Sequence, residues 1–267
     1  MIKPGEIQIK AQAQGVRDQQ IEKDYILSWI LRGLALHKSL SKILVFKGGT
    51  VLKKVYFKDY RFSEDLDFTL IHSTISNAQI FDCFREVFTL LKQMANIPLR
   101  LISEDVLRPG DVNFFIGYIG PLGGLGSNKK VKVDISRSEV LAFEPVMKPL
   151  ILGYTDLKAH HILCYTLEEV LVEKLRSIMQ RMQARDFYDV WYLLTVFQMD
   201  VNQYINEFDL KCRNKGLGSS DFHLKLEQRL AQYKGRWQNS LADQIQQLPS
   251  FDMVSREVLR QLKKMKF

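Results

Sequence analysis

The sequence lacks the residue patterns that define several large classes of protein. Its 3 cysteines, Cys83, Cys164 and Cys212, lie far apart and form no CxxC pair, so neither a disulfide framework nor a zinc knuckle is indicated. No apolar run approaches the ~20 residues that span a bilayer, and the N-terminal "MIKPGEIQIK" has no apolar signal core. These absences predict a cytoplasmic protein that is neither secreted nor inserted in a membrane.

Two common phosphate-binding motifs and a metal-binding pattern are also missing. The sequence contains no GxxxxGK[ST], which excludes a P-loop. The glycines of "GPLGGLG" do not follow a strand and open a helix, which excludes a dinucleotide-binding Rossmann fingerprint. The pair His160-His161 has no third ligand at metal-binding spacing, so packing or solvent exposure is its expected role. Internal repeats and low-complexity segments are absent as well.

Acidic residues are the minority among the charged ones. The 267 residues carry a formal net charge of +8, which favours polyanionic partners such as nucleic acid or nucleotides, although solubility alone would also explain it. With 46% hydrophobic and 25% charged residues, the composition is ordinary for a globular protein of one large or two modest domains.

Hydrophobic periodicity predicts a mixed α/β part followed by a helical part. Residues 17–36 and 78–94 have helical periodicity, and "TVLKKVYF" predicts a helix that starts at Thr50. Strands are expected at 42–46, 65–70, 112–119 and 129–136, the last two joined as a hairpin. The segment "HILCY" is a candidate last strand, the pattern after it is mostly helical, and Thr166 with Glu169 predicts a capping box. We therefore expect one domain over 1–160 and a helical domain over 161–267.

The stretch "FKGGTVLKKVYFKDYRFSEDLDF", residues 46–68, has the most distinctive chemistry. Asp65 and Asp67 lie two residues apart on a predicted strand, so both carboxylates project from one face, about 6–7 Å apart. Two neighbouring acids repel each other unless a cation lies between them, and a divalent metal ion is well suited to this. The alternative is a hairpin turn followed by a solvent-exposed acidic strand.

Two further features extend this hypothesis. The turn Gly48-Gly49-Thr50 would let backbone N–H groups approach phosphate oxygens closely. Asp134 lies on the polar face of the predicted strand 129–136 and is the candidate third ligand of a two-metal site.

Three segments, in this order, resemble the AbiEii/AbiGii-like nucleotidyltransferase toxins. They are "EKDYILSWILRGL", then "FKGGTVL" with "RFSEDLDF", then "TLEEVLVEKLRSIMQR" with "ARDFYDVWYLL". The resemblance implies an α/β (α+β) fold, in which a nucleotidyltransferase-fold mixed sheet with flanking helices is followed by an α-helical C-terminal domain that contributes to the active-site cleft. The longer spacer between the glycines and the acids is typical of this branch of the superfamily.

The resemblance also implies site residues. Asp65 and Asp67 match the metal pair, Lys174 matches the lysine of the family's "EKL" segment, and Asp186 matches the acid of "RD". On one straight helix Lys174 and Asp186 would lie about 120° apart, so they converge only if the helix breaks near "QRMQAR" or if they belong to adjacent helices. The alternative for both is helix salt bridging. The expected nucleotide-binding residues are Lys47, Gly48, Gly49, Thr50, Arg61 and Ser63, although strand-entry packing and capping remain open for Arg61 and Ser63.

The activity implied by the resemblance is transfer of a nucleoside monophosphate from an NTP, with Mg²⁺ or Mn²⁺ as cofactor. The expected acceptor is RNA, in particular the 3′ end of tRNA, and the expected partner is a co-encoded antitoxin. A protein or small-molecule acceptor stays open, because a fold does not fix the acceptor. A non-catalytic RNA-binding relative is the third possibility, and the intact pair Asp65 and Asp67 argues against it.

Overall fold

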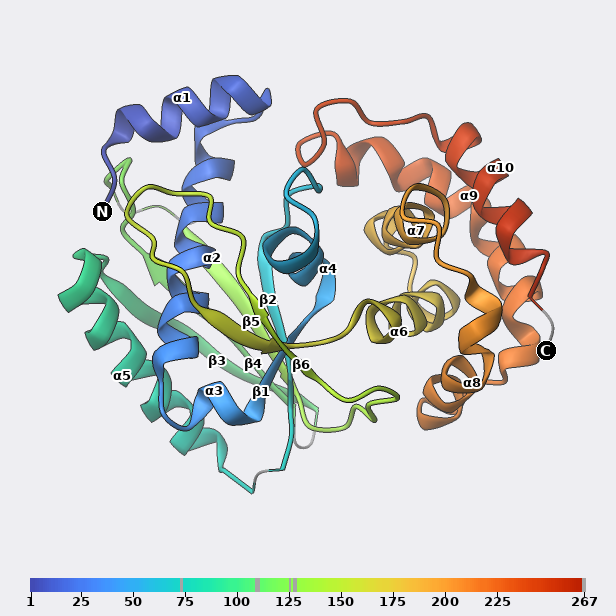
Figure 1. Ribbon diagram of the computed structural model, residues 1–267, viewed down its shortest axis with the longest axis horizontal. Helices are drawn as coiled ribbons and strands as arrows, with labels where there is room; N and C mark the ends of the chain where they lie inside the picture. The colour runs from blue at the N-terminus through green and yellow to red at the C-terminus, as the bar shows by residue number, and fades with distance from the viewer. Residues whose placement is uncertain (73, 109–110, 125, 127–128, 266–267) are drawn as a thin grey trace. The chain divides into compact units, whose positions relative to one another are not determined.

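The structure is a computed structural model that describes residues 1–72, 74–108, 111–124, 126 and 129–265. The chain forms two compact units (Figure 1). The first comprises Met1–Ser138 and Pro145–Cys164, and the second comprises Glu139–Glu144 and Tyr165–Phe267. The division therefore falls just after the boundary expected at residue 160, because the strand His161–Cys164 still pairs within the first unit.

The first unit is built on a mixed seven-stranded sheet with the order β3-β4-β5-β2-β1-β7-β6. The pairs β2–β5 and β1–β7 are parallel and the other neighbours are antiparallel. The expected strands and the β4–β5 hairpin are confirmed, except that β1 begins at Leu44 because residues 42–43 belong to helix α3, and β3 and β6 were not predicted. The strands are β1 (Leu44–Lys47), β2 (Asp65–Leu70), β3 (Leu99–Arg108), β4 (Asp111–Tyr118), β5 (Lys130–Ser136), β6 (Val146–Pro149) and β7 (His161–Cys164).

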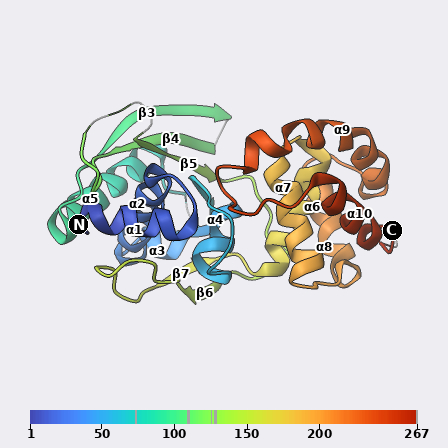
Figure 2. The same ribbon diagram turned by 90° about the horizontal axis from the view of Figure 1, so that it is seen from above.

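Helices pack around this sheet (Figure 2). Helices α2 and α5 lie side by side, and they approach so closely that a Cβ on Gly33 would stand 2.7 Å from Val87 Cγ1. Helix α5 packs on the sheet through Phe84, whose ring lies 4.9 Å from that of Phe114 on β4. The helical segments are α1 (Pro4–Gln14), α2 (Asp18–Leu36), α3 (Leu40–Ile43), α4 (Gly48–Val51), the π-helix η1 (Leu52–Tyr56) and α5 (Asn77–Ala95).

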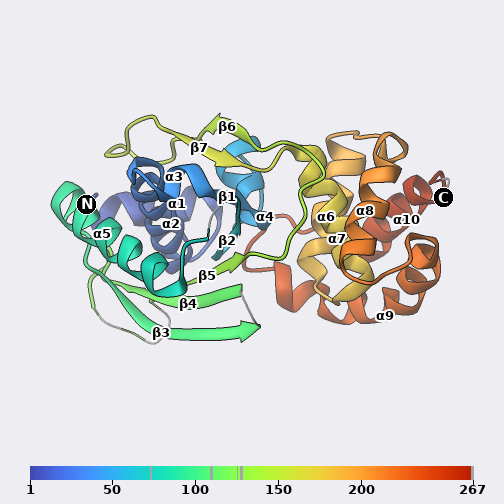
Figure 3. The same cartoon turned by 90° about the horizontal axis from the view of Figure 1, so that it is seen from below.

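The second unit is helical in the residues that the structure describes (Figure 3). Its first long helix begins as expected, with the Thr166 hydroxyl accepting from Glu169 N. The reciprocal half of the predicted capping box is wrong, because the Glu169 carboxylate instead accepts from the backbone of Ala142 and Phe143. The elements are α6 (Leu167–Gln180), α7 (Ala184–Trp191), η2 (Tyr192–Val196), η3 (Val201–Tyr204), α8 (Ile205–Asn214), η4 (Ser219–Asp221), α9 (Phe222–Leu241) and α10 (Phe251–Leu262).

None of the helices in the described part of the chain combines the length and the apolar character of a membrane span.

Candidate active site

The two carboxylates of strand β2 lie on one face of the sheet. Asp65 and Asp67 are half-buried, whereas Leu66 and Phe68 between and beside them are fully buried on the opposite face. This alternation follows from the two-residue period of a strand. The predicted geometry of the acidic pair is therefore present in the structure.

The polar face continues onto the neighbouring strand β5. Asp67 is the register partner of Asp134, and Asp65 is the register partner of Lys132. In-register residues of paired strands project to the same side, so Asp134 shares the face of the acidic pair, as its strand position predicted. The Asp134 carboxylate accepts from Lys132 Nζ at 2.8 Å and from Asn113 Nδ2 on β4. Asp134 therefore already has a cation and an amide as partners.

The glycine turn lies against the acidic pair. Gly48 has φ +79°, and a Cβ built there would stand 2.2 Å from Asp67 Oδ2. Glycine is needed at this position both for the left-handed backbone and for the space that the Asp67 carboxylate occupies. Sequence reasoning attributed this glycine to phosphate approach alone, and the contact with Asp67 is a second, structural reason for it.

Hydroxyl groups join the turn to the strand. Thr50 Oγ1 donates to the carbonyl oxygen of Asp65 at 2.6 Å, and it lies 2.7 Å from Ser63 Oγ. Both side chains are buried. Thr50 and Ser63 therefore fix the position of the short helix α4, which begins at Gly48 and not at Thr50 as expected, relative to the start of β2.

Three of the basic residues around the turn, Lys47, Lys54 and Arg61, are buried. Lys47 is the register partner of Asp67, and Arg61 donates to the carbonyl oxygen of Phe62 at 3.1 Å. Lys54 forms an ion pair with Asp24 of α2 at 2.7 Å. Burial disfavours the charged form of Asp24, but Lys54, together with Lys53 and the Tyr154 hydroxyl, outweighs this effect and holds the pKa of Asp24 below its usual value. Asp24 was missed by sequence reasoning, because no local pattern links it to Lys54.

A second cluster of charges lies within the helical unit. Lys174 Nζ is 2.6 Å from Asp186 Oδ1 and 2.7 Å from Asp189 Oδ2, and Arg181 Nε is 2.7 Å from Asp186 Oδ2. The predicted convergence of Lys174 and Asp186 is present, because α6 ends at Gln180 and α7 starts at Ala184. Asp189 was not predicted as part of this cluster.

The break between α6 and α7 is held by helix α9. The Tyr233 hydroxyl contacts the carbonyl oxygens of Ile178 and Arg181 at 2.9 and 3.0 Å, and Arg236 Nη1 donates to Met182 O at 2.7 Å. These contacts satisfy carbonyl groups that the end of a helix leaves without intrahelical partners. The sequence offered no signal for this role of Tyr233, because the contact spans more than 50 residues.

The cluster favours the charged form of Asp186 despite its burial. Asp186 is 2% exposed and Asp189 is fully buried. Burial raises the pKa of Asp186, but Lys174 and Arg181 outweigh it and hold that pKa below the usual range.

A family described as "Nucleotidyl transferase AbiEii toxin, Type IV TA system" matches residues 29–257. This range includes the acidic pair, the glycine turn and the charge cluster of the helical unit, but not Asp24. The chain belongs to the AbiEii nucleotidyltransferase toxin family. No curated protein matches the sequence.

Solved structures have the same fold as this AbiEii nucleotidyltransferase. JHP933 from Helicobacter pylori is 16% identical with a TM-score of 0.57, over 93% of this chain and 92% of the other. MenT4, a nucleotidyltransferase toxin from Mycobacterium tuberculosis, is 15% identical with a TM-score of 0.53, over 97% and 99%. A putative nucleotidyltransferase from H. pylori is 17% identical with a TM-score of 0.55, over 93% and 95%. At these identities the likeness shows the fold alone.

The residues of the sheet face fit a metal ion that a substrate helps to bind. Among the described residues, no group of three or more His, Cys, Asp or Glu side chains has the arrangement of a metal site. Asp65 and Asp67 supply two hard oxygen donors on one face, and Mg²⁺ is commonly held by one or two carboxylates together with substrate phosphates. The donor set of this AbiEii nucleotidyltransferase therefore fits a divalent ion that arrives with a nucleotide.

Proposed function

We propose that this AbiEii toxin transfers a nucleoside monophosphate from an NTP to an RNA acceptor, and that the acceptor is the 3′ end of tRNA. In this reaction an acceptor hydroxyl oxygen forms a bond to the α-phosphorus of the NTP. The bond from that phosphorus to the bridging oxygen breaks, and pyrophosphate and a proton are released. The observation that carries the proposal is the pair Asp65 and Asp67 on one sheet face beside the Gly48 turn.

Asp65 and Asp67 would hold the divalent cation, Mg²⁺ or Mn²⁺. When bound, the ion would neutralise phosphate charge and orient the triphosphate. We propose Asp134 as a third ligand because it shares the face and the register of the pair. The ion pair of Asp134 with Lys132 would have to open for this, so Asp134→Asn should impair transfer less than Asp65→Asn does.

The segment from Lys47 to Thr50 would bind the nucleotide. Its backbone N–H groups are hydrogen-bond donors suited to phosphate oxygens, and the N-cap residue Lys47 makes no side-chain cap to the helix that follows. Arg61 and Ser63 would support this segment from the start of β2. These roles rest on the family motif and on the proximity of the turn to the acids.

Lys174 and Asp186 would act in the same reaction, as the family motif implies. Lys174 would stabilise the negative charge that develops on the leaving pyrophosphate, and Asp186 would orient Lys174. The hydrogen bond of 2.6 Å between them supports the orienting role, because it fixes the position of the ammonium group.

An RNA acceptor is favoured by the net charge of +8, and we expect the reaction in the cytoplasm, where NTPs and tRNA occur. The family implies that a co-encoded antitoxin neutralises the toxin. The test is to incubate the purified protein with each α-labelled NTP, Mg²⁺ or Mn²⁺, and either tRNA, total protein or no acceptor. We expect label on tRNA, and none with Asp65→Asn. Label on protein alone would replace the RNA acceptor, and no label with any acceptor would overturn the proposal.

A further inference from the structure

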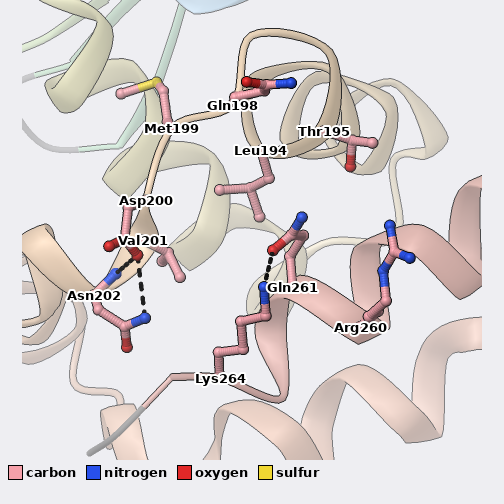
Figure 4. Close-up of a pocket in the computed structure, with 10 residues that line it drawn as sticks. All are labelled: Leu194, Thr195, Gln198, Met199, Asp200, Val201, Asn202, Arg260, Gln261 and Lys264. Carbon is pink, nitrogen blue, oxygen red and sulfur yellow. Dashed lines mark hydrogen bonds between the residues drawn. The ribbon is translucent and has the colours of Figure 1, made fainter.

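A cavity in the helical unit lies apart from the residues discussed so far. It has a volume of about 440 Å³ and lies between helix α10 and the segment that follows the π-helix η2 (Figure 4). This volume falls within the range of cavities that bind small molecules and nucleotides, about 300–1,000 Å³. All of its lining residues belong to the second unit.

The lining combines an apolar floor with amide groups. Leu194 and Val201 are buried, and Met199 lies beside them. Gln198, Asn202 and Gln261 supply side-chain amides, each with donor and acceptor atoms. An apolar surface with amides around it is suited to a planar group that has hydrogen-bonding edges, such as a nucleobase.

Two cations complete the lining. Arg260 makes no ion pair with any residue that the structure describes. Lys264 Nζ donates to Gln261 Oε1 at 3.0 Å, which leaves other donors of its ammonium group for a ligand. Asp200 also lines the cavity, but its carboxylate accepts from the backbone and the side chain of Asn202 at 3.0 and 3.1 Å. The Asp200 carboxylate therefore caps the start of η3. Arg260 and Lys264 are oriented toward a different part of the cavity (Figure 4).

The charge along helix α10 favours an anion. Its acidic residues have partners: Asp252 accepts from Lys234 at 2.8 Å, and Glu257 accepts from the indole of Trp191 at 2.7 Å. Four basic side chains of α10 and of the two residues that directly follow it are exposed. They are Arg256, Arg260, Lys263 and Lys264.

Two local features indicate a ligand at this position. Thr195 lines the cavity, and its buried Oγ1 has no hydrogen-bond partner in the described structure. A buried hydroxyl without a partner is costly, and such groups are rare in a packed interior. Phe197, which is 48% exposed, immediately precedes Gln198 in the chain, and an exposed aromatic ring can stack on a base.

We propose that this cavity binds one nucleotide of single-stranded RNA, with a phosphate at Arg260 and Lys264 and the base against Gln198, Asn202 and the apolar floor. The site would hold the acceptor RNA at a point other than its reacting end. An acidic protein segment would use the cations, but it would leave the amides and the apolar floor without a role. The inference rests on the proposed RNA acceptor, since a protein acceptor would have no need of it.

The test measures RNA binding at equilibrium, without transfer. The full-length protein is titrated into a fluorescein-labelled single-stranded RNA of mixed sequence, without NTP or metal, at several salt concentrations. Arg260→Gln combined with Lys264→Gln is compared with a control that also removes two exposed cations of the helical unit, Arg213→Gln combined with Lys234→Gln. Thermal melting checks that both variants are folded.

We expect the cavity variant to bind RNA about ten- to hundred-fold more weakly, and the control to stay within about two-fold of wild type. Because the two cations neutralise one phosphate, the slope of log affinity against log salt should be shallower than that of wild type by about 0.7. Asn202→Ala should weaken binding or change base preference without changing this slope. Equal RNA affinity of the cavity variant and the control would overturn the proposal. So would loss of antitoxin binding with RNA affinity intact, which would identify an acidic protein as the ligand.

Transfer assays distinguish a failure of the cavity proposal from a failure of the proposed function. If the cavity is not an RNA site but the acceptor is RNA, the cavity variant should still transfer nucleotide to tRNA with the wild-type KM for tRNA. If the acceptor is not RNA, wild-type protein should fail to label tRNA whatever the binding titrations show.

Discussion

Each unit has a pair of aspartates close together in sequence, and the two pairs have opposite environments. Asp65 and Asp67 lie on a strand face and are half-buried, next to a glycine turn. Asp186 and Asp189 lie on a helix, are almost completely buried, and both contact Lys174.

The difference in burial gives the aspartates of the two pairs different roles. A carboxylate that solvent reaches can exchange water for a metal ion or a substrate. A carboxylate that is buried against a lysine has a fixed partner, and removing that partner leaves a charge in a medium that solvates it poorly. We therefore expect substitutions of the strand pair to affect chemistry and substitutions of the helix cluster to affect folding as well.

The largest effect is expected for the strand pair. Asp65→Asn or Asp67→Asn should reduce nucleotide transfer by about a hundred- to ten-thousand-fold, because a metal contact contributes several kcal/mol to the transition state. Thermal melting should show no loss of stability, since each change removes one of two repelling charges. Asp82→Asn is the matched control, because its side chain is 68% exposed and lies on the surface of α5. Near-normal transfer by Asp65→Asn would contradict the assignment of the strand pair to metal binding.

The next largest effect is expected for the buried lysine. Lys174→Met should lower the free energy of unfolding by about 3–5 kcal/mol, because it removes the buried lysine that contacts both Asp186 and Asp189. Urea unfolding at neutral pH measures this change. Lys234→Met removes a lysine whose side chain is 60% exposed and paired with Asp252, and it should cost less than about 1 kcal/mol. An equal loss of unfolding free energy in the two variants would show that burial of the charge cluster does not make Lys174 more important for stability than an exposed lysine.

A smaller effect is expected at the turn. Gly48→Ala should destabilise the protein by about 1–3 kcal/mol and reduce transfer, because the new Cβ meets the Asp67 carboxylate in addition to the strained backbone. Gly123→Ala is a control for the backbone alone, since Gly123 has φ +67° and open space around it. Transfer should fall for Gly48→Ala and stay unchanged for Gly123→Ala. If both variants keep full activity, the contact between the turn and Asp67 has no catalytic importance.

Local patterns predicted the parts of this molecule that local physics determines. The two-residue alternation in "DLDFTL" predicts strand β2 with its correct bounds, and helical periodicity predicts α2 and α5 to within a residue at each end. The polar face of the strand 129–136 also indicated that Asp134 would share the side of the acidic pair. Strand β3 and helix α1 lacked such a pattern, since their residues do not alternate or repeat clearly.

Contacts between distant segments could not be read from the sequence. Glu169 has the spacing of a capping-box residue, yet the segment Glu139–Glu144 provides better partners for its carboxylate. The contact of Asp189 with Lys174 depends on the exact turn between α6 and α7, and that turn depends on Tyr233. In each case the decisive partner lies far away in the chain, where periodicity carries no information.

The smallest effect concerns the response of the helix cluster to acid. The pKa of Asp186 is held below its usual range in the folded protein, so the unfolded chain binds a proton at a higher pH than the folded chain does. The stability that Asp186 contributes is therefore complete above the unfolded pKa, near pH 4, and is lost as the pH falls through the folded pKa. Asp186→Asn should lower stability at neutral pH and reduce the slope of unfolding free energy against pH below about pH 4, by at most about 1.4 kcal/mol per pH unit. Urea unfolding at several pH values between 3 and 6 measures the slope, with Asp82→Asn as the control that should leave it unchanged. An unchanged slope in Asp186→Asn would show that Lys174 and Arg181 do not hold this carboxylate ionised, and the contrast with the strand pair would then rest on burial alone.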